Sequence, residues 1–195
     1  MSKEAELFLV PPSTAEGGKD LGTAKAAQAA GTAQIVAEDE AAAIDAARRL
    51  LSMLPENNLS GTAMFEFAPP ADTSVLSGIL DRLDDTSKCD IVKAIADEGT
   101  FLLLSNNFGQ GAHTALCSIG GYTVGMVGTG GVLDHNGAAR IARFVSVCDS
   151  FQIPVVTLIN TQGVAPSGAD ELSGAVRDMA RLGHVYAEAT TPKIA

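Results

Sequence analysis

The chain has 195 residues, of which 46% are hydrophobic and 18% are charged, with a formal net charge of −10. This apolar content can bury the core of one ordinary domain, or of parts of two, which excludes disorder over most of the chain. The 23 acidic residues outnumber the 13 basic ones, which argues against a surface for nucleic acid or for anionic membranes.

Apolar runs, the first residues and the cysteines indicate in which compartment of the cell the chain is found. No apolar run approaches the roughly 18 to 20 residues that span a bilayer, and the first residues lack the apolar stretch of a secretory signal. Cys89, Cys117 and Cys148 are too few and too scattered for a disulfide framework or a zinc site, so we expect buried, inert thiols. The sequence therefore predicts a reducing, cytoplasmic location and no bound metal.

The first half of the chain predicts short elements with a single clear helix. That helix covers residues 39–51, where acidic residues come first and arginines come near the end, in keeping with the helix dipole. Residues 56–73 are rich in Asn, Gly and Pro and predict a connector. The remaining expected elements are strands at 7–10, 34–37 and 101–104, a helical turn at 23–30, and short helices at 75–83 and 89–96.

The second half predicts an α/β arrangement. Gly120-Gly121 between two apolar runs, 112–119 and 122–127, indicates a β-hairpin. The apolar run at 153–159 is typical of a strand that is covered on both faces. The other expected elements are a loop at 128–131, a helix at 136–150, a loop at 160–168, one helix at 169–190 with a stripe of Leu172, Val176, Met179, Leu182 and Tyr186, and a new strand beginning near 192.

Two groups of residues suggest chemistry but have simpler explanations. His113, His135 and His184 are far apart and have no partner at metal-ligand spacing, so we expect structural or solvated roles. The stretch Gly125–Gly131 resembles a dinucleotide loop, but Leu133 stands where the third glycine would be. A glycine loop that closes a strand is the favoured interpretation, and a nucleotide-binding module is the weakest of the functional hypotheses.

The loop 160–168 is the strongest candidate site. It follows a buried strand and precedes a helix, the position at which open α/β sheets bind ligands. Free N–H groups at such a junction can hold an oxyanion. Because no side chain in the loop is an evident general acid or nucleophile, any catalysis there would depend on backbone amides.

The second half also resembles a known family. Its most specific block runs from Arg143-Phe144 to Pro154 and lies within a longer series that ends near Ile194. The sequence resembles the carboxyltransferase subunits of biotin-dependent acyl-CoA carboxylases and their decarboxylase relatives, such as the methylmalonyl-CoA decarboxylase alpha subunit. The segments that carry the resemblance are 121–127, 139–145, 148–154 and 163–194, with 7–9, 21–24 and 53–55 in the family's order.

The resemblance implies an α/β, crotonase-like fold built from ββα units, present here as a partial carboxyltransferase that assembles into homo-oligomers. It implies that residues 1–58 are the tail of an N-terminal carboxyltransferase domain. Residues 59–88 would be a connector, and residues 89–195 the front part of a C-terminal crotonase-like domain.

The activity implied is the movement of carboxylate between carboxybiotin and an acyl-CoA, of the propionyl/methylmalonyl or the acetyl/malonyl type. Biotin would arrive on a separate biotinyl carrier protein, with biotin carboxylase or decarboxylase subunits as further partners and a coenzyme A thioester as substrate. The backbone amides of Gly163 and Val164 would hold the anion. The residues expected to bind biotin or substrate are Asn160, Gly163, Val164, Ala165, Pro166 and Ser167.

Two functional alternatives remain open beside the nucleotide hypothesis. The family's glycine turn for the acyl-CoA oxyanion is expected before Met1, and its biotin-side turn after Ala195. The chain is therefore either part of the carboxyltransferase or decarboxylase, or a non-catalytic truncated homologue that serves as an oligomer or assembly component.

Overall fold

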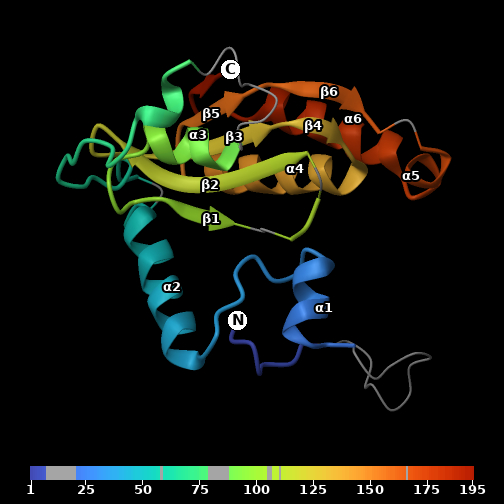
Figure 1. The fold of residues 1–195 in the computed structure, drawn as a ribbon, viewed down its shortest axis with the longest axis horizontal. Helices are drawn as coiled ribbons and strands as arrows, with labels where there is room; N and C mark the ends of the chain where they lie inside the picture. The colour runs from blue at the N-terminus through green and yellow to red at the C-terminus, as the bar shows by residue number, and fades with distance from the viewer. Residues whose placement is uncertain (8–20, 58, 79–87, 105–106, 110, 166) are drawn as a thin grey trace.

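The computed structural model describes residues 1–7, 21–57, 59–78, 88–104, 107–109, 111–165 and 167–195. Figure 1 shows a layered α/β body that contains the second half of the chain, with the N-terminal segment and its helices on one side. The helices are α1 (Ala24–Ala29), α2 (Glu40–Met53), the 3₁₀ turn η2 (Ser74–Leu76), α3 (Lys88–Ile95), α4 (His135–Ser150), α5 (Gly168–Leu172) and α6 (Ala175–Glu188). The strands are β1 (Leu102–Leu104), β2 (Ala112–Ile119), β3 (Tyr122–Thr129), β4 (Gly131–Leu133), β5 (Val155–Leu158), β6 (Thr161–Val164) and β7 (Lys193–Ile194).

The main sheet has five described strands in the order β1-β2-β3-β5-β7. β1, β2 and β3 are antiparallel neighbours, whereas β3, β5 and β7 run parallel. Strands β4 and β6 form a separate two-stranded parallel sheet. The predicted mixed α/β class is therefore confirmed, as is the strand that was expected near 192.

The predicted hairpin is confirmed, and its turn depends on two glycines. β2 and β3 pair from Ala112↔Thr129 to Ile119↔Tyr122. Gly120 and Gly121 have φ values of 61° and 85°, the left-handed region that a two-residue hairpin turn of this hand requires. Any residue with a Cβ atom would be strained at both positions.

Helices cover both faces of the main sheet (Figure 1). On one face, α4 buries Ile141, Phe144 and Val145 in the larger core cluster, and Met179 and Leu182 of α6 pack against this cluster. On the other face, Val92 and Ala96 belong to a second cluster with residues of β2 and β3. Asp134 precedes α4 as its N-cap, and its side chain accepts the Gly137 N–H at 2.6 Å.

Close packing of α4 against β3 explains one glycine of the Gly125–Gly131 stretch. A Cβ atom on Gly125 would lie 2.6 Å from Cys148 Sγ and 3.2 Å from the Phe144 ring. Gly125 is thus required for the contact between helix and sheet. The stretch itself lies in β3 and the start of β4, and its residues pair within sheets.

Substitution of Gly125 with alanine is therefore expected to lower the free energy of unfolding by about 1 to 3 kcal/mol, because the core has no room for the methyl group. Gly183→Ala is the matched control: Gly183 is in α6, and a Cβ there meets nothing within 4 Å. That variant should be more stable than wild type by roughly 0.5 to 1 kcal/mol. Urea denaturation of both variants measures the difference. Equal effects of the two substitutions would contradict the packing argument.

The main helix predicted in the first half of the chain is also confirmed. α2 begins after Asp39, whose carboxylate accepts the Ala42 N–H at 2.7 Å, and it ends before Pro55. The predicted turn at 23–30 is α1, capped by Thr23. The helix expected at 89–96 and the strand expected at 101–104 correspond to α3 and β1.

Three predictions in the first half were wrong or fall partly outside the described residues. Residues 34–37 are not a strand: Met1 and Lys3 make backbone hydrogen bonds to Ile35 and Ala37, but within the described residues this pairing amounts to one isolated bridge, Ser2↔Ala37. Of the helix expected at 75–83, the description contains only the turn η2, and most of the strand expected at 7–10 lies outside it. The boundaries at 58 and 88 stay a prediction.

Three predictions in the second half were also wrong. The expected loop at 128–131 contains the end of β3 and the start of β4, and the expected loop at 160–168 contains β6. The expected helix at 169–190 divides at Gly174, whose φ of 105° is left-handed and interrupts helical geometry. Leu172 and Val176 are therefore outside the apolar stripe, with 92% and 70% of their surfaces exposed.

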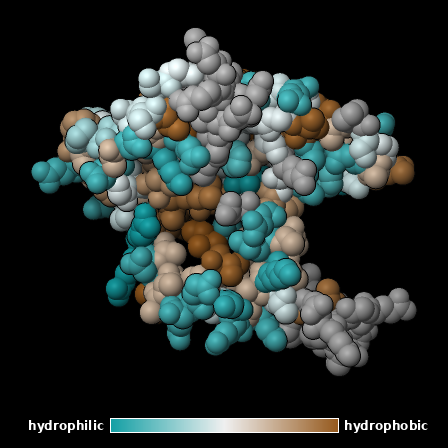
Figure 2. All heavy atoms as spheres, in the orientation of Figure 1, coloured by the Kyte–Doolittle hydropathy of each residue, from teal (hydrophilic) through white to brown (hydrophobic). Residues whose placement is uncertain are grey.

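An apolar hollow of about 540 Å³ separates the N-terminal segment from the main sheet. Leu50 and Leu54 line it from the side of α2, and Leu104, Leu116 and Phe144 line it from the sheet and α4. Figure 2 shows apolar atoms gathered in this hollow. Among the described helices, none is both long enough and apolar enough to cross a bilayer.

Candidate functional site

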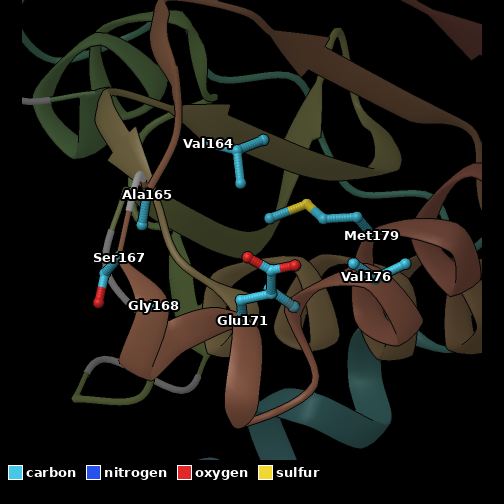
Figure 3. A pocket seen from close by; sticks show the side chains of 8 residues that line it. Val164, Ala165, Ser167, Gly168, Glu171, Val176 and Met179 are labelled. Carbon is cyan, nitrogen blue, oxygen red and sulfur yellow. The ribbon is translucent and has the colours of Figure 1, made fainter.

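A second cavity, of about 580 Å³, lies where β6, α5 and α6 meet. Figure 3 shows Val164 of β6, Glu171 of α5 and Met179 of α6 directed toward a common space. The residues that line it are Val164, Ala165, Ser167, Gly168, Glu171, Ala175, Val176 and Met179. The walls are thus mainly apolar, with one carboxylate, as is common in small-molecule sites.

The β4–β6 sheet forms one wall of this pocket. Val132 and Leu133 pair with Gly163 and Val164, after a shift of register between Gly131 and Val132. Thr161 stabilises this shift of register, because its hydroxyl donates to the Gly131 carbonyl at 3.0 Å and accepts the Gly163 N–H at 3.1 Å. Gly163 itself has a φ of 117°, which favours glycine.

Three of the predicted site residues line the pocket, namely Val164, Ala165 and Ser167. Asn160 and Gly163 do not: the Asn160 N–H donates to Thr129 Oγ1 at 3.1 Å, and the Gly163 N–H donates to Thr161. Pro166 lies outside the described residues. The predicted loop therefore reaches the pocket through its second half.

The two amides predicted to hold an anion differ in direction. The Ala165 N–H donates to the Leu133 carbonyl at 2.9 Å, toward β4. Successive N–H groups of an extended segment point to opposite sides, so the Val164 N–H points away from β4. The Gly163 N–H, by contrast, is engaged by Thr161. Of the two predicted amides, that of Val164 is therefore the one directed away from β4, and that of Gly163 is the one bonded to Thr161.

Sequence reasoning did not assign Glu171, Val176 and Met179 to the site. Val176 and Met179 were expected to lie on the apolar stripe of one long helix, 169–190. A signal was present, because a glycine at 174 can interrupt a helix and turn its two halves to different surfaces.

The remaining candidates have structural roles. Cys117 and Cys148 are fully buried and free of disulfides. Burial raises the pKa of each thiol to about 12, with the Asp97 charge adding to the effect at Cys117, so neither is a thiolate at neutral pH. The side chain of Cys89 lies outside the description. Within the described residues, no His, Cys, Asp or Glu cluster could hold a metal ion.

The sequence matches known proteins over most of its length. A family profile described as "Carboxyl transferase domain" matches residues 12–195. A propionyl-CoA carboxylase beta chain of Saccharopolyspora erythraea is 36% identical, over 90% of this chain and 36% of its own. The methylmalonyl-CoA carboxyltransferase 12S subunit of Propionibacterium freudenreichii subsp. shermanii is 34% identical, over 100% of this chain and 40% of its own.

The structure agrees with these matches. A crystal structure of the transcarboxylase 12S hexamer, with hydrolysed methylmalonyl-coenzyme A bound, superposes with a TM-score of 0.89 at 32% identity. That alignment covers 99% of this chain and 42% of the other, so the chain spans about two fifths of the length of such relatives. The resemblance to carboxyltransferases and the crotonase-like fold are confirmed. The chain belongs to the carboxyl transferase domain family.

Proposed function

We propose that this chain is part of a biotin-dependent acyl-CoA carboxyltransferase or decarboxylase, and that the pocket beside β6 is its biotin side. The supporting observation is that Val164, Ala165 and Ser167 line one cavity in a chain that matches the family from residue 12 to residue 195. The relatives carry propionyl-CoA carboxylase and methylmalonyl-CoA carboxyltransferase names. The acyl-CoA substrate, the separate biotinyl carrier and assembly into a homo-oligomer belong to this proposal.

The pocket offers two polar groups that match a biotin ring. Carboxybiotin bound there would supply the carboxyl group. The Val164 N–H would donate to its ureido oxygen, and a preorganised amide stabilises negative charge without reorienting. Glu171, directed into the same space, can accept the hydrogen of the second ureido nitrogen. Ala165, Val176 and Met179 supply apolar surface in the walls.

Ala165→Trp tests the pocket, because the indole would occupy the space beside Val164 that the biotin ring needs. The wild-type chain, labelled with ¹⁵N, is titrated with biotin and separately with methylmalonyl-CoA while amide resonances of Val164, Ala165 and Gly168 are followed by NMR. We expect biotin to shift these resonances and Ala165→Trp to weaken the binding by at least about tenfold, since steric exclusion removes most of the buried contact. Ala187→Trp, at an exposed position of α6, is the matched control and should bind like wild type.

The outcomes separate the functional alternatives. Ring binding at Val164 together with methylmalonyl-CoA decarboxylation, with or without a companion polypeptide, would support the catalytic proposal. If neither ligand shifts the resonances at millimolar concentration, and no decarboxylation occurs in either mixture, the catalytic proposal fails. The chain would then be the non-catalytic assembly component.

A further inference from the structure

Four charged or titratable side chains meet where α4, α5 and α6 converge beside the pocket. His135, the first residue of α4, lies between Asp170 of α5 and Asp178 of α6. Its Nδ1 is 3.3 Å from Asp178 Oδ2, and its Nε2 is 3.7 Å from Asp170 Oδ1. Arg177 binds both oxygens of Asp178, at 3.0 Å each. One imidazole thus contacts carboxylates from two different helices.

The cluster is partly shielded from water. The side chains of His135, Asp170 and Asp178 are 20%, 12% and 9% exposed. The hydrogen bonds from Arg177 lower the pKa of the Asp178 carboxyl; burial opposes this effect and His135 adds to it. Asp178 is therefore an anion, and its Oδ2 accepts a hydrogen from His135 Nδ1. The neutral imidazole then turns its Nε2 lone pair toward the Asp170 carboxylate, with which it cannot form a hydrogen bond.

The charged groups around the imidazole are mainly acidic. With Asp170, Asp178 and Arg177 ionised, the cluster has one net negative charge, which a proton on His135 neutralises. Two further carboxylates belong to the surrounding elements: Asp134 caps α4 by accepting the Gly137 N–H, and Glu171 of α5 points into the pocket. A proton on Nε2 would give Asp170 a charged hydrogen-bond donor.

The α5 helix, which contains Asp170, makes few other contacts with the rest of the described structure. α5 has five residues, and none of its side chains is buried. Ser167 caps it, and the Asp170 carboxylate accepts the backbone N–H of His135 at 3.2 and 3.4 Å. Elements that bury little surface open most readily, so one charge-assisted contact has a large influence here. Because Gly168 and Glu171 of α5 line the pocket, the position of α5 decides the shape of that wall.

We propose that His135 is a positioning residue: when protonated it draws Asp170, and with it α5, against the start of α4, and so fixes the Gly168–Glu171 wall of the pocket. Histidine side chains commonly change charge between pH 5 and 8, so the wall is firm at mildly acidic pH and loosens as the pH rises. That this wall contacts a biotin ring depends on the proposed function. The movement of α5 does not.

Amide hydrogen exchange of the whole ¹⁵N-labelled chain tests this inference without any ligand. The Glu171 and Ser173 amides donate within α5 to Ser167 O and Ala169 O. The protection factor of each amide is its intrinsic exchange rate divided by its observed exchange rate. We expect this factor to rise by about threefold from pH 8 to pH 5.5, a change that corresponds to the stabilisation by a partly exposed ion pair. The rise should follow the titration of the His135 ring resonances. Protection of the buried Val145 amide in α4 should stay constant over the same range.

Three variants decide between positioning and a general pH effect. His135→Gln and Asp170→Asn should each abolish the rise, whereas His184→Gln, an exposed histidine of α6, should keep it. If His135→Gln does not fold, Asp170→Asn carries the test. A rise that persists in either of the first two variants, or that appears equally at Val145, overturns the inference. Because no biotin or CoA is present, such a failure leaves the proposed function untouched.

Discussion

Arg140→Met is expected to lower the free energy of unfolding by about 3 kcal/mol or more, because it removes a buried charged group that holds several carbonyl oxygens. Arg140 lies in α4 and is 3% exposed. Its Nη1 donates to the carbonyls of Ala112 and Phe108 at 2.9 and 3.2 Å, and its Nη2 donates to the Leu104 carbonyl. The guanidinium therefore joins the end of β1 to the start of β2.

Methionine matches the arginine stem but offers no donor, so each of these carbonyls would lose its hydrogen bond from the guanidinium. Urea denaturation monitored by circular dichroism measures the loss. Arg181→Met, at an exposed position of α6, is the matched control and should change the free energy of unfolding by less than about 0.5 kcal/mol. If Arg140→Met were as stable as its control, the guanidinium would not hold the strand ends together.

Asp97→Asn is expected to lower the free energy of unfolding by about 2 kcal/mol at pH 7, since it replaces a charged acceptor of three hydrogen bonds. Asp97 is 3% exposed. It accepts the Gly120 N–H at 3.0 Å, and the Gly121 N–H and the Ser118 hydroxyl at 2.7 Å each. An amide group in its place would turn an NH₂ toward one of these donors.

The loss should shrink in acid. Burial alone would raise the pKa of the Asp97 carboxyl, but the hydrogen bonds from Gly121, Ser118 and Gly120 lower it below the ordinary 3.8. A lowered folded-state pKa gives stability that is present above 3.8 and is lost as the pH falls through the folded value. The difference between wild type and Asp97→Asn should therefore be smaller at pH 3 than at pH 7. Denaturation curves at both pH values measure it.

Asp72→Asn provides the comparison for Asp97. The pKa of the Asp72 carboxyl is also lowered, by hydrogen bonds from the side chain and backbone of Ser74, but the group is exposed. Water replaces a lost hydrogen bond there, so we expect almost no change in stability at either pH. A constant difference between wild type and Asp97→Asn from pH 7 to pH 3 would contradict the assignment of an ionised, bonded carboxylate to Asp97.

Elements set by local signals were predictable from the sequence. The β2–β3 hairpin follows from Gly120-Gly121 between apolar runs. The α2 helix follows from acidic residues in its first turn and arginines near its end, and α4 follows from apolar residues at a spacing of three to four. The family resemblance correctly gave the α/β, crotonase-like class. These features depend on residues that are close in the chain, where periodicity and turn chemistry are informative.

Features that depend on distant partners were not predictable. β6 was taken for a loop because its residues pair with β4, and neither strand has an apolar run that would mark it alone. Of the residues that line the pocket, the sequence predicted only Val164, Ala165 and Ser167 as site residues. Glu171 and Met179 line it because the helix is interrupted at Gly174. The contacts of His135 join three helices, which no spacing in the sequence reveals.

The pairing of β4 with β6 also bears on the order in which the chain assembles. Gly131 and Thr161 are 30 residues apart, and α4 and β5 lie between them. Closing so long a loop is unfavourable until the intervening helix and strand have docked on the main sheet. We therefore expect the pocket beside β6 to form only after this docking, and a molecule that binds there to stabilise the finished domain as a whole.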